Sequence, residues 1–286
     1  MKIDYLSKQA VRRFIDSALK EDVGDGDHTT LASIPPNLEQ EAKITAKSDG
    51  VVAGIELAQW IFQSVDPTIE IETSKVDGDQ VIEGDLVLLI KGKARSILTA
   101  ERLVLNCMQR MSGIATYTQK LSSLIKHTKT KLLDTRKTSP NFRICEKWAV
   151  KIGGGVNHRF GLYDMILLKD NHIDYAGGVK KAISSTKKYL KEANKDLKIE
   201  VETRSLEEVE QVLECGGVDV IMLDNMLPSA MNEAVRMING TCQTEASGGI
   251  TEKNIKEMAE TGVDFISVGA LTHSYESMDL SLTAIK

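Results

Sequence analysis

The chain has 286 residues, enough for one large domain or two smaller ones. Apolar residues make up 42% of it and charged residues 27%, which excludes a disordered or fibrous protein. The net charge of -5 argues against nucleic acid or an anionic membrane as a partner, although a local cluster of Arg and Lys can still bind an anionic substrate. The four cysteines have neither zinc-site nor disulfide spacing, and they indicate the reducing cytoplasm.

The first 22 residues are predicted to form an amphipathic helix. Their apolar side chains recur at helical spacing, at Val11, Phe14, Ile15, Ala18 and Leu19. Charges every few residues exclude the apolar core of a signal peptide, and the most apolar short run, Leu86–Ile90, is far too short to cross a bilayer. The acidic run EDVGDGDHTT lacks the ligand spacing of a calcium loop, so a polar turn is expected there.

Residues 40–95 are predicted to form a small sheet of strands and turns. Polar and apolar residues alternate in KVDGDQVIEGDLVLLIKGKA, and turn signals stand at Asp77-Gly78 and Gly84-Asp85. A long helical stretch is expected from Ser96, with a break at Ser112-Gly113.

The second half alternates short β-rich runs with amphipathic helical segments, which predicts βα units around a parallel sheet. The β-rich runs are 131–134, 164–169, 198–202, 219–224, 244–247 and 264–269. A polar residue or a glycine closes each run, at Asp134, Lys169, Glu202, Asp224, Ser247 and Gly269. In an α/β barrel the active site lies at the carboxyl ends of the strands, so the site is expected there.

Two of these strand ends have the composition of a phosphate site. Small residues in EASGGI and SVGALT let backbone N–H groups approach a phosphate closely. Glu202 and Asp224 end adjacent predicted strands and suit a Mg²⁺ ion that also contacts a polyphosphate. Glu200 shares the strand face of Glu202, and the sequence leaves open which of the two faces the site.

The segment from 132 to 173 concentrates cationic side chains and contains few acids. It holds Arg136, Lys137, Arg143, Lys147, Lys151, His158, Arg159 and Lys169. Arg binds carboxylates with a planar fork and Lys binds phosphates as a point charge, so a multiply anionic substrate is expected. His158 is assigned to this site because it stands beside Arg159 in a glycine-rich loop, whereas His28, His127 and His172 are given no role.

Several motifs together resemble the quinolinate phosphoribosyltransferases, also called carboxylating nicotinate-nucleotide pyrophosphorylases. They are LLDTRKTSP, GGGVNHR, LLKDNHI, EVE, IMLDN, EASGGI and ISVGALTHS, in this order, with EDVGDGDHTT, GVVAG and ILTAERLVLNCMQRMSGIAT before them. The resemblance spans nearly the whole chain. It implies transfer of phosphoribosyl from phosphoribosyl pyrophosphate to quinolinate with Mg²⁺, giving nicotinate mononucleotide, pyrophosphate and CO₂ in NAD biosynthesis.

The resemblance also implies an α/β protein of two domains. An N-terminal α/β sandwich-like domain, residues 1–112, would precede an incomplete, about seven-stranded α/β barrel, residues 113–274. The tail at 275–286 would pack on the first domain. A homodimer is implied, in which Arg102 of one subunit reaches the barrel of the other.

Roles for individual residues follow from the same motifs. Arg102, Arg136, His158 and Arg159 would bind the quinolinate carboxylates. Lys137 and Lys169 would lie between the two substrates, and Glu202 and Asp224 would face the ribose and Mg²⁺, directly or through water. The 5′-phosphate would be held by Ser247, Gly248, Gly249, Gly269 and Ala270, with His273 nearby. One departure is Asn141, which stands where the family usually has Gly; Asn tolerates a left-handed backbone, so the turn is expected to survive.

Four alternatives stay open. The molybdenum-operon paralogue of the family would keep the fold and use another aromatic acid, and nicotinate phosphoribosyltransferase would need fewer carboxylate-binding groups. A Schiff-base aldolase would use Lys169 as its amine. A non-catalytic phosphate-binding barrel would keep the glycine loops without needing the Arg cluster and the two carboxylates.

Overall fold

A computed structural model describes residues 5–285 and divides them into two compact units. The first unit contains the residues up to Gln119, Lys137–Gly154 and those from Ala270 onward. The second unit contains Lys120–Arg136 and Gly155–Gly269. Among the described residues, no helix is both long and apolar enough to cross a membrane.

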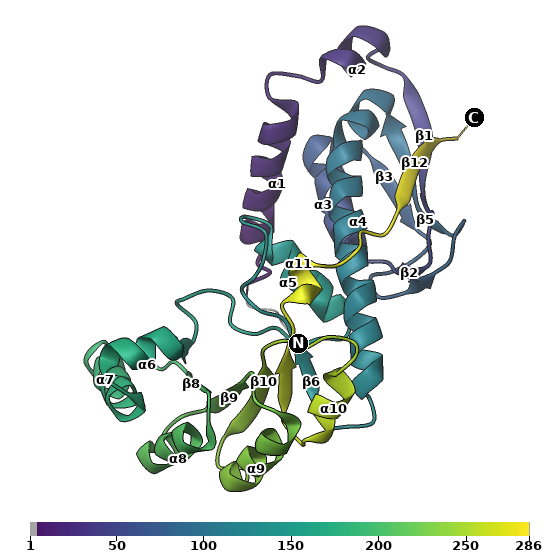
Figure 1. Ribbon diagram of the computed structural model, residues 1–286. Helices are drawn as coiled ribbons and strands as arrows, with labels where there is room; N and C mark the ends of the chain where they lie inside the picture. Colours follow the sequence, from purple (N-terminus) through teal and green to yellow (C-terminus); the bar gives the residue numbers. More distant parts are fainter. Residues whose placement is uncertain (1–4, 286) are drawn as a thin grey trace. The chain divides into compact units, whose positions relative to one another are not determined.

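The first unit is built on an antiparallel sheet with the strand order β12-β1-β5-β3, and a short β2-β4 pair lies apart from it (Figure 1). Its strands are β1 (Glu39–Ala46), β2 (Gly50–Val51), β3 (Glu70–Thr73), β4 (Gln80–Val81), β5 (Leu86–Lys93) and β12 (Leu280–Ala284). Its helices are α1 (Lys8–Val23), α2 (His28–Ser33), α3 (Ile55–Val65), most of α4 (Ala94–Ile125), α5 (Arg143–Ile152) and α11 (Ala270–His273). The C-terminal strand β12 therefore joins the sheet formed by the N-terminal residues.

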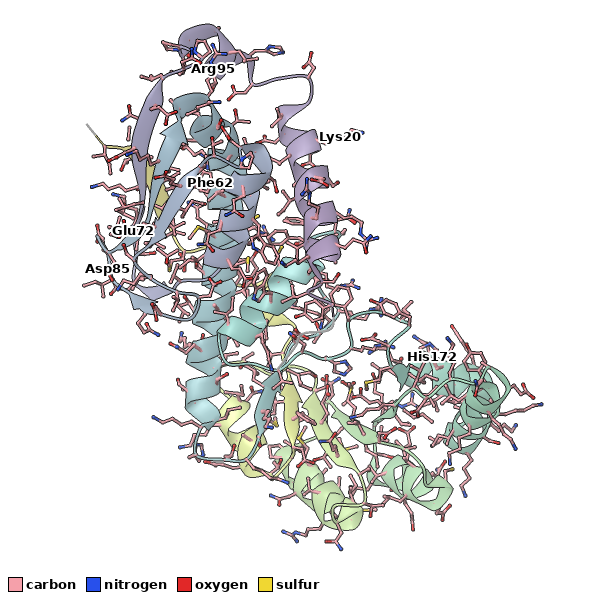
Figure 2. All side chains as sticks on the ribbon, turned by 180° about the vertical axis from the view of Figure 1, so that it is seen from behind. Lys20, Phe62, Glu72, Asp85, Arg95 and His172 are labelled. Atoms are coloured by element: carbon pink, nitrogen blue, oxygen red, sulfur yellow. The ribbon has the colours of Figure 1, made fainter. Side chains whose placement is uncertain are left out.

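Helix α1 confirms the amphipathic pattern at the N-terminus. Ser7 caps it by accepting a hydrogen bond from the Ala10 amide, and Val11 and Ile15 are buried. Lys20 is exposed on the same helix, whereas Phe62 of α3 is fully buried in the core of the first unit (Figure 2).

Two expectations for the first unit were wrong. Residues 55–65 form helix α3 instead of strands or turns, because the carboxylate of Asp77 accepts the Ile55 amide and caps the helix from a distant turn. Helix α4 also runs through Ser112-Gly113 without a break. Gly113 serves close packing: a Cβ there would collide with the backbone carbonyl oxygen of Glu276.

The second unit contains a parallel sheet with the strand order β6-β11-β10-β9-β8-β7. The strands are β6 (Lys131–Leu133), β7 (Ile166–Leu168), β8 (Ile199–Thr203), β9 (Val220–Asp224), β10 (Gln243–Ser247) and β11 (Phe265–Ser267). The helices are α6 (Asp170–Ala176), α7 (Val179–Glu192), α8 (Leu206–Cys215), α9 (Pro228–Ile238) and α10 (Ile255–Glu260). Val156 adds a single parallel bridge to Leu133 beside β6. The predicted strands and the α/β barrel architecture are confirmed.

Every residue of β8 is buried, as expected for a parallel strand covered on both faces. Such strands are normally apolar, yet β8 carries Glu200 and Glu202, and β10, which is separated from β8 by β9, carries the buried Glu245. Burying a carboxylate lowers stability unless it is paired. These glutamates therefore indicate that this part of the barrel serves function rather than stability.

Candidate active site

Charged side chains meet at the carboxyl ends of β7 and β8. Lys169 directly follows β7, and its Nζ lies 3.1 Å from Oε2 of Glu202 on β8. Glu202 is buried, while the Lys169 side chain is 49% exposed. The other oxygen of Glu202 accepts a 3.5 Å hydrogen bond from the Asp170 amide at the start of α6. The ammonium is thus held in place by a buried carboxylate while it still reaches the surface.

Glu200 and Glu202 both point to the same side of β8, which answers the question that the sequence left open. Glu202 lies at the strand end and contacts Lys169, whereas Glu200 lies one pleat deeper and contacts His158. The two carboxylates therefore face the same interior but have different partners.

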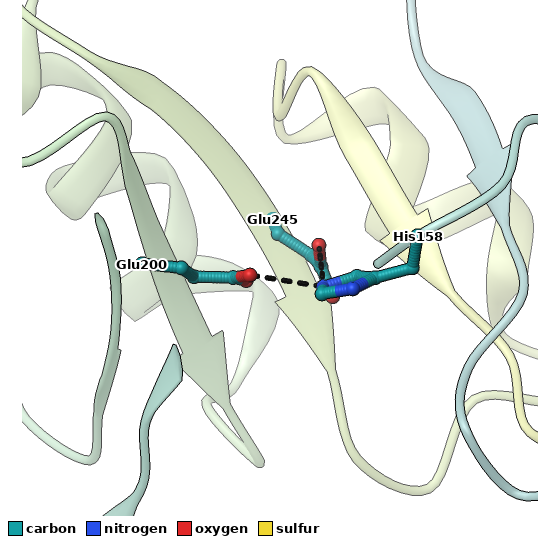
Figure 3. A group of neighbouring side chains, drawn as sticks. All are labelled: His158, Glu200 and Glu245. Carbon is teal, nitrogen blue, oxygen red and sulfur yellow. Dashed lines mark ion pairs between the residues drawn. The ribbon is translucent and has the colours of Figure 1, made fainter. Parts of the chain in front are cut away.

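A buried cluster of His158, Glu200 and Glu245 lies inside the barrel (Figure 3). Nε2 of His158 lies 2.9 Å from Oε2 of Glu200 and 3.5 Å from Oε2 of Glu245. On the other edge of the ring, Nδ1 accepts a 2.7 Å hydrogen bond from the Arg159 amide. Both ring nitrogens of His158 thus contact the protein.

The two carboxylates govern the charge of this cluster. Burial alone would lower the pKa of His158, but Glu200 and Glu245 raise it to about 10. Burial and the neighbouring Glu245 raise the pKa of Glu200 to about 7. The contact between Nδ1 and the Arg159 amide requires an unprotonated Nδ1, so in the structure the ring carries its proton on Nε2, the nitrogen that faces the two carboxylates.

The loop that carries His158 is anchored by Asp134. This carboxylate is fully buried after β6 and accepts hydrogen bonds from the His158 amide at 2.9 Å and from Nδ2 of Asn157 at 2.6 Å. Arg159 follows, and its Nη1 donates to the Met165 carbonyl oxygen at 3.1 Å. Burial lowers the pKa of Arg159, and the positive charge of Arg136 lowers it further. Arg136, His158 and Arg159 all lie in the second unit, and Arg136 is close enough to Arg159 to lower its pKa.

The loop after β10 is shaped by glycines. Gly248 and Gly249 have φ values of 90° and 61°, which side chains rarely adopt. A Cβ at Gly248 would also collide with the side chain of Asn225, and the backbone N–H of Asn225 donates to the Ser247 carbonyl oxygen at 2.9 Å. Ser247 pairs in register with Asp224 on β9, which places the glycine loop beside a second carboxylate.

Glu202 and Asp224 meet the simplest requirements for Mg²⁺, which prefers one or two carboxylates together with substrate phosphates. Asp224 is partly exposed at the end of β9, and its Oδ2 accepts a 2.7 Å hydrogen bond from Nδ2 of Asn225. The oxygens of Glu202 and Asp224 accept hydrogen bonds from neutral or cationic groups. These two carboxylates therefore fit a magnesium–polyphosphate complex.

The first unit has a cavity of about 600 Å³ of its own, and two predicted site residues line it, Lys137 and His273. Its lining consists of Arg110, Lys137, Thr138, Ser139, Thr272, His273, Tyr275 and Ser277. The Thr272 hydroxyl donates to the Lys137 carbonyl oxygen at 2.8 Å. Ala270 begins α11, the helix that carries Thr272 and His273. Arg102 is exposed on α4 and does not line this cavity.

Sequence reasoning missed Arg110 and Glu146. Nη2 of Arg110 lies 3.1 Å from the Ser139 hydroxyl and 3.3 Å from Oε1 of the fully buried Glu146, and the guanidinium stacks over Phe142 and Tyr275. Oε2 of Glu146 accepts the Ser139 amide, so the pair supports the loop that follows Lys137. An Arg in a mostly apolar helical stretch was the available signal.

The turn at Pro140-Asn141 survives the departure from the family pattern. Asn141 has a φ of 62°, the left-handed conformation in which the family places Gly. The prediction for this turn is confirmed.

The arrangement defines a phosphoribosyltransferase of the α/β-barrel class, and comparisons with known proteins specify the family. Residues 27–112 match the quinolinate phosphoribosyl transferase N-terminal domain and residues 114–283 match its C-terminal domain. The chain belongs to the quinolinate phosphoribosyltransferase family.

Relatives agree along nearly the whole chain. Quinolinate phosphoribosyltransferase (decarboxylating) 1b of Nicotiana tabacum is 50% identical over 283 residues, which cover 94% of this chain and 80% of that protein. The chloroplastic nicotinate-nucleotide pyrophosphorylase (carboxylating) of Arabidopsis thaliana is 47% identical and covers 95% of this chain and 82% of its own. The crystal structure of NadC from Streptococcus pyogenes is 40% identical, with a TM-score of 0.91 over 98% of this chain and 99% of that chain.

Proposed function

We propose that the chain transfers the phosphoribosyl group of phosphoribosyl pyrophosphate to the ring nitrogen of quinolinate and releases pyrophosphate and CO₂. The observation that carries this proposal is the Lys169–Glu202 pair at the strand ends, in a barrel that also gathers Arg136, His158 and Arg159. A cation held by a buried carboxylate beside further cationic groups suits two polyanionic substrates that repel each other. The product is nicotinate mononucleotide.

The reaction needs positioning and charge rather than a protein nucleophile. The pyridine nitrogen attacks C1 of the ribose while the bond from C1 to the pyrophosphate oxygen breaks, and positive charge develops on the ribose. The new N–C bond makes the ring a pyridinium. The adjacent cationic nitrogen stabilises the electron pair that stays on C2 when the 2-carboxylate departs as CO₂, and a proton then binds to C2.

Each predicted residue keeps one task in the proposal. Glu202 and Asp224 place negative charge at the strand ends, where it stabilises the developing charge of the ribose. Lys169 neutralises substrate anions, and Lys137 has the same task. The carboxylates of quinolinate bind to Arg102, Arg136, His158 and Arg159. The 5′-phosphate binds at Ser247, Gly248, Gly249, Gly269 and Ala270, with His273 contributing charge.

Magnesium is part of the proposal. Glu202 and Asp224 are the residues that would hold it, directly or through water, because they are the carboxylates at the ends of the adjacent strands β8 and β9. When bound, the ion supplies positive charge that offsets the pyrophosphate leaving group.

A homodimer and a cytoplasmic location complete the proposal. Arg102 is exposed on α4, as a residue that serves the partner subunit must be. The four cysteines are all unpaired thiols, which agrees with a reducing compartment.

The test follows nicotinate mononucleotide and CO₂ together in reactions that contain quinolinate, phosphoribosyl pyrophosphate and Mg²⁺, with nicotinate as a parallel substrate. Equal amounts of both products from quinolinate alone support the proposal. Turnover of nicotinate without CO₂, or turnover of neither acid by folded protein, contradicts it. Borohydride trapping with a carbonyl substrate separates the aldolase alternative, which requires an adduct on Lys169.

A further inference from the structure

Two buried carboxylates in the barrel have no task in the proposed reaction. Glu200 on β8 and Glu245 on β10 have exposed fractions of 0% and 1%, and both point at the ring of His158 (Figure 3). Neither oxygen of Glu200, nor Oε1 of Glu245, has a hydrogen-bond partner among the described residues, and the contact of Glu200 with Nε2 is an ion pair. Burying an ionised carboxylate costs several kcal/mol, and packing alone does not offset that cost. We therefore expect Glu200 and Glu245 to contribute to function.

The ring of His158 is fastened on both edges. Nε2 faces the two carboxylates, while Nδ1 contacts the Arg159 amide, and Asp134 holds the backbone of His158 itself. Turning the ring over would replace both nitrogen contacts with C–H groups. The two carboxylates therefore favour one orientation of the ring. In that orientation Nδ1 accepts the Arg159 amide and positions the backbone there.

The charges around His158 come from several elements. Glu200 faces it from β8, Glu245 from β10, and Asp134 approaches its backbone from the end of β6. Arg159 is the neighbouring cation on its own loop. Glu202 is engaged by Lys169 instead. Only Glu200 and Glu245 among these face Nε2, so they are the groups that decide where this ring edge points.

We propose that Glu200 and Glu245 are positioning residues for His158, which hold its ring and, through the contact of Nδ1 with the Arg159 amide, the backbone of Arg159 in one arrangement, and thereby tighten the binding of quinolinate by Arg159. This inference rests on the proposed function, in which His158 and Arg159 bind the quinolinate carboxylates. Neither Glu touches substrate in this view, because each acts through the imidazole.

A divalent metal on the same three side chains is the competing explanation. Their donor atoms lie within 4.8 Å of one another, and His with two carboxylates is a common ligand set. The 2.9 Å ion pair between Nε2 and Oε2 of Glu200 favours a direct contact without a metal, because two ligand atoms at about 2.0–2.1 Å from a tetrahedral ion lie farther apart than that.

The test compares Glu200→Gln, Glu245→Gln and the double variant with wild type, and uses Glu210→Gln on the exposed surface of α8 as the matched control. Gln keeps the shape and an acceptor oxygen but removes the charge. Steady-state kinetics give KM for quinolinate, KM for phosphoribosyl pyrophosphate and kcat separately. A 15N NMR spectrum reports which ring nitrogen of His158 carries a proton, and the signals that vanish in His158→Gln are those of this ring. Titration with Zn²⁺ tests whether the three side chains bind a metal.

The double variant should raise KM for quinolinate about tenfold or more, as expected when charge-assisted hydrogen bonds are lost, while KM for phosphoribosyl pyrophosphate changes less than about twofold. Wild-type Nε2 should be protonated, and the imidazole signals should move in both single variants but not in Glu210→Gln. Unchanged KM values, or equal losses for both substrates, overturn the inference.

The NMR measurement on wild type keeps the inference testable if a variant does not fold or if quinolinate is not the substrate. An unprotonated Nε2 overturns it in either case. Stoichiometric Zn²⁺ binding that is lost in Glu245→Gln also overturns it and assigns the cluster to a metal. Wild-type protein that does not turn over quinolinate contradicts the proposed function instead, and the ring signals still report on the positioning.

Discussion

Nη2 of Arg110 lies 3.3 Å from Oε1 of Glu146, a carboxylate with no exposed surface, while the Arg110 side chain itself is 40% exposed. The pair joins the long helix α4 to the loop that contains Ser139. Burial raises the pKa of Glu146, and Arg110 opposes that rise. The buried Glu146 needs the positive charge of Arg110 to stay ionised at low cost, whereas the partly exposed Arg110 needs Glu146 less.

Arg110→Met should therefore lower the free energy of unfolding by about 1–3 kcal/mol, because it leaves a buried carboxylate without its cation. The measurement is urea unfolding at neutral pH. Arg12→Met removes an exposed ion pair with Asp16 and should cost less than about 1 kcal/mol. Equal losses in both variants would show that Arg110 contributes no more than an exposed pair.

Gly113→Ala should destabilise the protein even though the same change usually stabilises a helix by ~0.5–1 kcal/mol. The added Cβ would meet the carbonyl oxygen of Glu276, which is backbone and cannot turn aside. A loss of at least ~1 kcal/mol in thermal or urea unfolding is expected. Asn106→Ala, at an exposed position of the same helix, should stabilise slightly. A stabilised Gly113→Ala protein would refute the close packing.

His158 should make stability depend on pH in the alkaline range. Its pKa is about 10 in the folded protein and ordinarily 6.5, so the stabilisation is fully present below pH 6.5 and is lost as the pH rises through 10. Urea unfolding of wild type and His158→Gln should show a difference in free energy that shrinks from pH 6.5 to pH 9.5. A constant difference would mean that the ring does not titrate in this window.

Lys169→Met should reduce kcat/KM by about 10²–10³, because a cation aimed at the substrates is lost and Glu202 is left buried without it. Lys169→Arg should retain more activity than Lys169→Met, since it keeps the charge. Lys195→Met, at an exposed position after α7, serves as the control. Steady-state assays with both substrates make the comparison, and wild-type kinetics of Lys169→Met would remove Lys169 from the mechanism.

Arg102 tests the dimer. Arg102→Ala and Lys169→Met proteins, each inactive alone, should regain activity when mixed, because a hybrid dimer contains one intact site if Arg102 serves the partner subunit. Subunit exchange is checked with differently tagged chains. Hybrids that form but stay inactive would show that each site uses its own Arg102.

The strands of the second unit could be predicted from sequence because they are short apolar runs that end in a polar residue or a glycine, and each lies next to an amphipathic helix. Helix α3 was missed although its buried residues recur at helical spacing; only its cap at Asp77, far along the chain, needed the tertiary structure. The break expected at Ser112-Gly113 failed for a similar reason. The glycine is explained by the backbone of Glu276, which no local pattern reveals.

The site likewise contains residues that the sequence predicted and side-chain contacts that only the structure shows. The motifs alone named Lys169, Glu202, His158 and Arg159, and the left-handed tolerance of Asn alone predicted the backbone at Asn141. Side-chain partners needed the folded chain. Glu200 and Glu202 are equivalent in an alternating strand, and only the loop that brings His158 under the strand ends separates them.

Sequence by itself thus determined the fold class, the strand ends and the family, because periodicity and motif spacing are properties of neighbouring residues. The tertiary structure decided which buried charges meet: Glu200 and Glu245 with His158, Glu202 with Lys169, and Glu146 with Arg110. Those pairings join residues that are distant along the chain, and their strength depends on burial, which exists only once the chain has folded.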